Sequence, residues 1–199
     1  MHKILITGSI HEIGLELLRR EKDLEIRYAP ELPYEEILKI IPDFHCILTR
    51  SETAIPRELI DSAPNLKVIA RAAVGIGNID VDYATEKGIL VINTPGKNNT
   101  SAAELAIGLL LSAMRNIVPA HSHMSKLKWD RHSFTGTELL GKLIGIIGLG
   151  NVGHRVARYA KAFEMEVLAY DPYVSDEVFD RHSAKKCTLE ELLTSADVI

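Results

Sequence analysis

The chain has 199 residues, of which 46% are hydrophobic and 25% charged, and its formal net charge is −4. This composition is ordinary for a globular protein, and the length suffices for one large domain or two small ones. A negative balance without a long basic run disfavours nucleic-acid or anionic-membrane partners. The apolar runs are too short to cross a bilayer, and Cys46 and Cys187 suggest no disulfide framework. We therefore expect a cytoplasmic protein.

Strand-like and helical patterns alternate through the first half of the chain. Such alternation predicts an α/β fold with a parallel sheet covered on both faces. The expected strands are 4–7, 24–28, 46–49, 67–70 and 89–92, and the expected helices between them are 11–20, 34–40, 56–62 and 81–87.

Residues 99–117 form the longest helical pattern, and their apolar side chains surround most of the helix. A helix of this kind is expected to be buried, because no face of it suits water. We expect it to pack between two domains, 1–96 and 97–199, followed by a polar loop over 121–141 that carries Trp129.

Three glycines in G-x-G-x-x-G spacing follow an expected strand over 143–147 and precede a helical pattern. Gly148 would permit the tight turn, Gly150 would let a pyrophosphate approach the backbone, and Gly153 would let the helix pack close to the sheet. The helix N-terminus would direct free N–H groups and a positive dipole end at the phosphates. The context predicts dinucleotide binding, with an ordinary strand–turn–helix connection as the alternative.

Asp171 stands at the end of the next expected strand, 167–170, about twenty residues beyond the glycines. Its carboxylate is placed to accept hydrogen bonds from the adenosine ribose hydroxyls and would repel a 2′-phosphate. Pro172 and Tyr173 follow it, and no arginine is close by in sequence to accept such a phosphate. NAD is therefore favoured over NADP.

The C-terminal residues predict a further helix and the start of a strand. Thr188 and Glu191 have the spacing of a capping box for a helix over 189–194. Residues 197–199 are expected to open the third strand of the nucleotide domain. Since a dinucleotide domain needs two halves, we expect that domain to be incomplete in this chain.

With these residues in view, the chain resembles the D-isomer-specific 2-hydroxyacid dehydrogenases, especially the phosphoglycerate dehydrogenase branch. The resemblance implies a flavodoxin-like substrate domain plus an incomplete Rossmann-type NAD-binding domain, both with parallel sheets. It also implies oxidation of 3-phosphoglycerate to 3-phosphohydroxypyruvate in serine biosynthesis, by a homodimer or homotetramer. The blocks that carry it are TRSET at 49–53, RAAVGIGNIDVDYATEKGILVINTPG at 71–96, TSAAELAIGLLLSAMRNI at 100–117, and KWDRHSFTGTELLGKLIGIIGLGNVG at 128–153.

The same resemblance assigns binding residues. Substrate carboxylate and phosphate would be held by Arg50, Ser51 and Arg71, helped by the backbone N–H groups of Val74 and Gly75. Both arginines end expected parallel strands, where open α/β sheets bind ligands, and guanidinium groups suit oxyanions; surface ion pairs are the alternative.

Val74 would also border the nicotinamide, and Asn151 and Val152 would cover the pyrophosphate. Two positions depart from the family pattern: Gly77 replaces an acid before Asn78, and Glu164 replaces a glycine after the dinucleotide helix. If position 164 is left-handed, the side chain there costs about 1 kcal/mol.

The family's catalytic arginine, glutamate and histidine have no match before Ile199, so we nominate no catalytic residue and expect this chain alone not to turn over. A metal site is not expected, since His121 and His123 lack cysteine or acidic partners at ligand spacing. Two alternatives share the scaffold: a glyoxylate or hydroxypyruvate reductase, and an NAD-sensing binding protein of the C-terminal-binding corepressor type.

Overall fold

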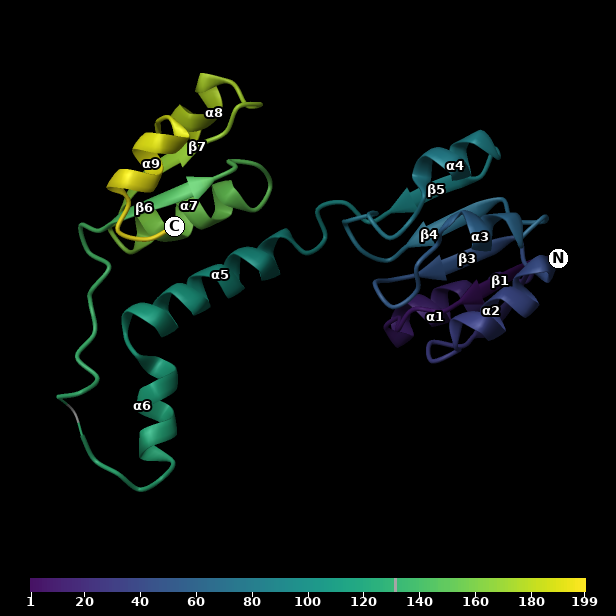
Figure 1. Ribbon diagram of the computed structural model, residues 1–199, viewed down its shortest axis with the longest axis horizontal. Coiled ribbons are helices and arrows are strands. Elements are labelled where there is room, and N and C mark those ends of the chain that lie inside the picture. Colours follow the sequence, from purple (N-terminus) through teal and green to yellow (C-terminus); the bar gives the residue numbers. More distant parts are fainter. Residues whose placement is uncertain (131) are drawn as a thin grey trace. The chain divides into compact units, whose positions relative to one another are not determined.

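The computed structural model describes residues 1–130 and 132–199, and Figure 1 labels most of their helices and strands. The chain forms two compact units, Met1–Lys97 and Asn98–Ile199. Each unit has its own sheet and its own hydrophobic core.

The first unit is a parallel five-stranded sheet in the order β2-β1-β3-β4-β5. This is the flavodoxin-like order, so the expected fold class is confirmed. The strands are β1 (His2–Ile6), β2 (Leu24–Tyr28), β3 (Cys46–Thr49), β4 (Val68–Arg71) and β5 (Leu90–Asn93). The connecting helices are α1 (Glu12–Arg19), α2 (Tyr34–Ile40), the 3-10 turn η1 (Ile41–Asp43), α3 (Arg57–Asp61) and α4 (Val81–Glu86).

The alternation of side chains along β1 separates two cores. Leu5 points into the larger core with residues of α2, α3 and α4. Ile4 and Ile6 point the other way and pack with Leu15 of α1. The helices therefore lie on both faces of the sheet, as the βα alternation predicts.

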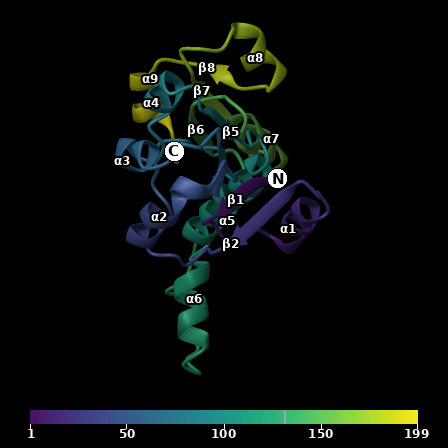
Figure 2. The same ribbon diagram turned by 90° about the vertical axis from the view of Figure 1, so that its right-hand side faces the viewer.

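The second unit contains β6 (Leu143–Ile147), β7 (Glu166–Tyr170) and β8 (Lys185–Lys186), paired in parallel in that order. Its later helices are α7 (Gly153–Ala162), α8 (Asp176–Arg181) and α9 (Leu189–Ser195), and α9 begins with the expected capping box. Figure 2 shows these elements from a second direction.

Val198 forms a parallel bridge to Ile144, on the edge of β6 that β7 does not occupy. The sequence led us to expect residues 197–199 to open the third strand of this unit. That expectation is wrong, because β8 is the third strand and pairs with β7. Successive strands are first added on one side of β6, as β7 and then β8, and the chain then returns to the other side of β6 at Val198. This change of side at β6 is the switch point of a Rossmann-type sheet.

The long helix is shorter than expected and is followed by a second helix. α5 (Asn99–Met114) ends before Asn116, whose left-handed φ of 54° interrupts the helix that was expected to reach 117. α6 (Ile117–Met124) then occupies the start of the segment expected to be a loop. Pro119 is compatible with α6 because the first turn of a helix needs no N–H donors.

α5 is not buried all round in this chain. Ala103, Ile107 and Leu110 are buried, but Leu105 is 63% exposed and Leu109 62% exposed, since α5 buries only the face that packs toward α7 and β6. In the described part of the chain, no single helix is long and apolar enough to span a membrane. Among these helices, α5 and α6 together are long and apolar enough for a membrane span by length and composition, but they meet at a bend of 65°.

Candidate functional site: the glycine loop and the strand ends

The loop between β6 and α7 is shaped by its glycines. Gly148 has a φ of +95°, a conformation that side chains rarely adopt, and its N–H donates to the Tyr170 carbonyl at 2.8 Å. A Cβ on Gly153 would lie 1.9 Å from the Gly148 carbonyl oxygen, so only glycine lets α7 start this close to the strand end. A Cβ on Gly150 would meet nothing within 4 Å, which leaves the backbone open to a ligand.

Four consecutive amides stand at the start of α7. The N–H groups of Gly150, Asn151, Val152 and Gly153 donate to no acceptor among the residues described. A helix N-terminus has such free donors and the positive end of the helix dipole, and together these suit an anion.

Asp171 faces this loop from the end of β7. One carboxylate oxygen accepts the N–H of Leu149 at 2.8 Å, and the other accepts the N–H of Tyr173 at 2.8 Å. These backbone donors, that of Tyr173 foremost, lower the pKa of Asp171, so it is ionised at neutral pH. The carboxylate thus ties the glycine loop to the loop after β7.

The loop fits a dinucleotide on geometric grounds. Free amides suit a diphosphate, the open side of Gly150 admits it, and an ionised carboxylate lies at the neighbouring strand end. Each oxygen of Asp171 accepts one protein N–H and has a second lone pair that a ribose hydroxyl could use.

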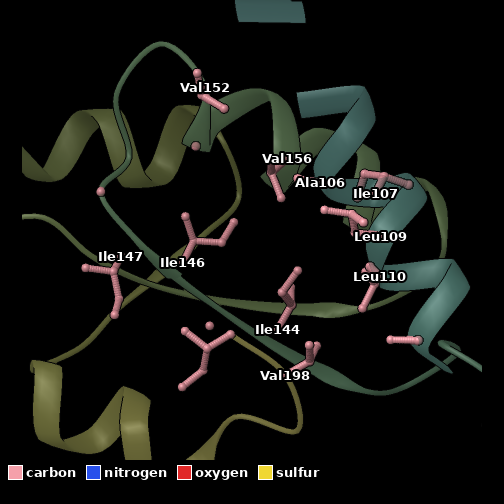
Figure 3. Close-up of a pocket in the computed structure, with 15 residues that line it drawn as sticks. Ala106, Ile107, Leu109, Leu110, Ile144, Ile146, Ile147, Val152, Val156 and Val198 are labelled. Atoms are coloured by element: carbon pink, nitrogen blue, oxygen red, sulfur yellow. The ribbon is translucent and has the colours of Figure 1, made fainter. Parts of the chain in front are cut away.

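An apolar pocket of about 670 Å³ lies beneath the loop, between α5, β6 and α7. In Figure 3 the side chains of Ile107, Leu110, Ile144, Ile146 and Val156 surround it. Because its lining holds no charged side chain, the pocket is not suited to binding a phosphate, whereas the free amides of the loop are.

The residues expected to bind substrate lie in the first unit, at the C-terminal ends of its strands. Arg71 ends β4, and Arg50 and Ser51 follow β3. Arg71 Nη1 donates to the Arg50 carbonyl at 2.9 Å, and Arg50 Nη1 donates to the Ser9 carbonyl at 3.1 Å. Both arginines thus donate to backbone carbonyls, and neither forms an ion pair with the residues that the structure describes.

Asn78 is the residue of this cluster that sequence reasoning overlooked. Its amide donates to the carbonyls of Arg50 at 3.0 Å and Thr53 at 2.7 Å, while its oxygen accepts from Arg71. The only sequence signal was its place in the RAAVGIGNID block. Asn78 thus fixes the 50–53 loop against Arg71.

Val74 and Gly75 lie in the loop after β4. Val74 is 37% exposed, and its carbonyl accepts from Asn93 at 2.7 Å. A Cβ on Gly75 would meet nothing within 4 Å, so the backbone here is approachable.

The structure thus gathers the predicted site residues into two clusters: the glycine loop with Asp171 in the second unit, and the arginines with Asn78 in the first. In residues 1–130 and 132–199 no group of three or more His, Cys, Asp or Glu side chains could hold a metal ion.

Comparisons with known proteins agree with this fold. The family described as "D-isomer specific 2-hydroxyacid dehydrogenase, catalytic domain" matches residues 4–196. D-3-phosphoglycerate dehydrogenase of Archaeoglobus fulgidus is 44% identical over 197 residues, which cover 99% of this chain and 37% of that protein. Hydroxypyruvate reductase of Thermotoga maritima is 42% identical over 171 residues, covering 86% of this chain and 56% of that protein.

Among solved structures, D-lactate dehydrogenase of Aquifex aeolicus, complexed with NAD and lactic acid, is similar with a TM-score of 0.83 at 26% identity. That match covers 99% of this chain and 59% of the other. The chain spans less than two fifths of the length of the phosphoglycerate dehydrogenase it matches. On the evidence of the family match and of these relatives, the chain belongs to the D-isomer-specific 2-hydroxyacid dehydrogenases.

Proposed function

We propose that this chain is part of an NAD-dependent D-2-hydroxyacid dehydrogenase. The observation that carries the proposal is that four amides of the glycine loop have no acceptor among the described residues and lie beside the ionised Asp171. When bound, NAD would supply the hydride acceptor. The chain's own residues would hold the diphosphate by backbone N–H groups and the adenosine ribose by Asp171.

The charge of Asp171 supports NAD over NADP, because a 2′-phosphate would be repelled. Calorimetric titration of the chain with each dinucleotide tests this. NAD+ should bind, and NADP+ should bind at least about tenfold more weakly, as expected for a like-charge contact of more than 1 kcal/mol. Equal affinity for the two would refute the cofactor assignment.

We further propose 3-phosphoglycerate as the substrate, oxidised to 3-phosphohydroxypyruvate for serine biosynthesis. In this proposal Arg50, Ser51 and Arg71 hold the substrate's carboxylate and phosphate, with Val74 and Gly75 contributing N–H groups. The extensive identity to D-3-phosphoglycerate dehydrogenase supports the choice, and so does a site with two guanidinium groups. The whole protein would act in the cytoplasm as a homodimer or homotetramer. Its substrate domain would end near residue 96, where the NAD-binding domain begins.

A hydroxypyruvate reductase is the second candidate, favoured by the identity to the Thermotoga maritima enzyme. The two substrates differ by a phosphate, so comparing 3-phosphoglycerate with D-glycerate separates them. In an NMR titration, 3-phosphoglycerate should change the amide chemical shifts of residues 50–51 and 74–75 at concentrations where D-glycerate leaves them unchanged. Equal responses would favour the reductase. NAD-dependent capture of peptides, with no response to either acid, would instead favour a corepressor-like binding protein.

A further inference from the structure

Two side chains on the first turn of α7 are hydrogen-bonded back to carbonyls of the glycine loop. His154 Nδ1 lies 2.7 Å from the Gly150 carbonyl oxygen. Arg155 Nη1 donates to the Asn151 carbonyl at 2.5 Å. Both contacts reach back four residues, so they act on the peptides whose N–H groups form the anion cradle.

Holding a carbonyl fixes the direction of the next amide. A trans peptide is planar, and its C=O and N–H point in opposite directions. The Gly150 carbonyl therefore sets the aim of the Asn151 N–H, and the Asn151 carbonyl sets that of the Val152 N–H. Without the two side-chain contacts, these peptides would have one fewer bond each to resist rotation.

The ring of His154 is itself held on two sides. A carbonyl oxygen can only accept, so Nδ1 carries the hydrogen, and Nε2 is then free to accept from Arg155 Nη1 at 2.9 Å. The ring of His182, which caps the C-terminus of α8, stacks on that of His154 with centroids 4.7 Å apart and planes 19° apart. One tautomer and one ring orientation satisfy all these contacts.

We propose that His154 is a positioning residue for the cofactor diphosphate, acting together with Arg155. Its imidazole N–H holds the Gly150 carbonyl so that the Asn151 N–H faces the phosphates, and Arg155 fixes both the tautomer of His154 and the next peptide. The inference rests on the proposed binding of NAD. In this proposal His154 and Arg155 contact the loop, and only the backbone N–H groups contact the diphosphate.

Two substitutions separate the hydrogen bond from the ring stack. In H154F the ring can still stack on His182, but the donor is lost. In H154N the stack is lost, while the side-chain amide Nδ2 takes the place of Nδ1 and can donate to the Gly150 carbonyl. K161A, farther along the exposed side of α7, removes a positive charge without touching the loop and serves as the control.

The affinities to compare are those for NAD+ and for adenosine, which lacks the diphosphate. Loss of one hydrogen bond that orients a donor should raise the Kd of H154F for NAD+ about fivefold, and that of H154N and K161A less than about twofold. The Kd for adenosine should stay within about twofold of wild type in every variant. A general loss of structure would instead weaken both ligands together.

A double-mutant cycle tests the partnership with Arg155. If Arg155 acts through the same network, H154F/R155M should weaken NAD+ binding less than the product of the single effects. Multiplicative effects would mean that Arg155 acts only as a nearby positive charge, which would overturn its assigned role. Nitrogen-detected NMR of the wild-type ring should show the Nδ1–H tautomer, and an Nε2–H tautomer would overturn the role of His154.

The outcomes also separate this inference from the proposed function. If the wild-type chain binds neither NAD+ nor ADP, both fall together. If wild type binds NAD+ and H154F binds it equally well, the positioning role alone falls and the cofactor assignment stands.

Discussion

Replacing Gly153 with alanine tests the packing at the start of α7. The added Cβ would lie 1.9 Å from the Gly148 carbonyl oxygen and 3.3 Å from Ile146 Cγ2. The first neighbour is backbone at the end of β6, so it cannot rotate aside as a flexible side chain would. Either the helix start or the strand end must move.

The size of the effect follows from two opposing contributions. Alanine is better than glycine in a helix by about 0.5–1 kcal/mol. Forcing an extra methyl group into a filled position costs typically about 1–3 kcal/mol, and a backbone clash as close as this belongs at the upper end. We therefore expect G153A to lose about 2–2.5 kcal/mol of unfolding free energy, after the helix gain is subtracted.

Urea denaturation followed by circular dichroism measures this change, and G150A is the matched control. A Cβ at position 150 meets no atom within 4 Å, so its stability should change by less than about 0.5 kcal/mol. The same methyl group would occupy the approach to the free amides, so G150A should lose NAD+ affinity at nearly unchanged stability. If G153A proved as stable as wild type, the start of α7 would have room for a methyl group, and the close packing would not require glycine.

Three further changes probe other parts of the structure. The pKa of Asp171 is lowered, chiefly by the N–H of Tyr173. Its contribution to stability is therefore complete above the unfolded-state pKa of about 4 and is lost as the pH falls through the folded-state pKa. The difference in urea midpoint between wild type and D171N should shrink from pH 6 to pH 2, and a constant difference would contradict this. N78A frees the Arg50 carbonyl and should weaken 3-phosphoglycerate binding about tenfold by calorimetry; unchanged binding would remove Asn78 from the site. Glu164 has a φ of 57°, so E164G should raise the thermal midpoint by an amount equivalent to about 1 kcal/mol, and a lower midpoint would refute the strain.

Glu164 illustrates what sequence reasoning could reach. The family's glycine position can be recognised from sequence, and the structure shows it left-handed, two residues after the last residue of α7. The N–H of Met165 donates to the Ala160 carbonyl at 3.1 Å and that of Glu164 to Lys161 at 3.0 Å, which is the Schellman pattern that requires this conformation. The apolar strands and the glycine loop were equally accessible, because their signals are local.

Elements whose signals are not local were missed. β8 consists of Lys185 and Lys186, and two exposed lysines on a sheet edge give no apolar pattern to detect. The end of α5 near Met114 depends on the left-handed Asn116, which an apolar pattern continuing past it conceals. His154 has no signal in the local sequence pattern, because its partner His182 is distant in sequence.

The contact between the Gly148 carbonyl and Gly153 has a consequence for the kinetics of ligand capture. Strand end and helix start touch directly, so the intervening bend has no room to fold inward, and Asp171 secures it through Leu149. A dinucleotide would thus meet a surface that is already rigid, and would spend little of its interaction energy on ordering the chain. Association should accordingly proceed in a single phase whose rate rises linearly with nucleotide concentration, without the plateau that a slow loop rearrangement imposes.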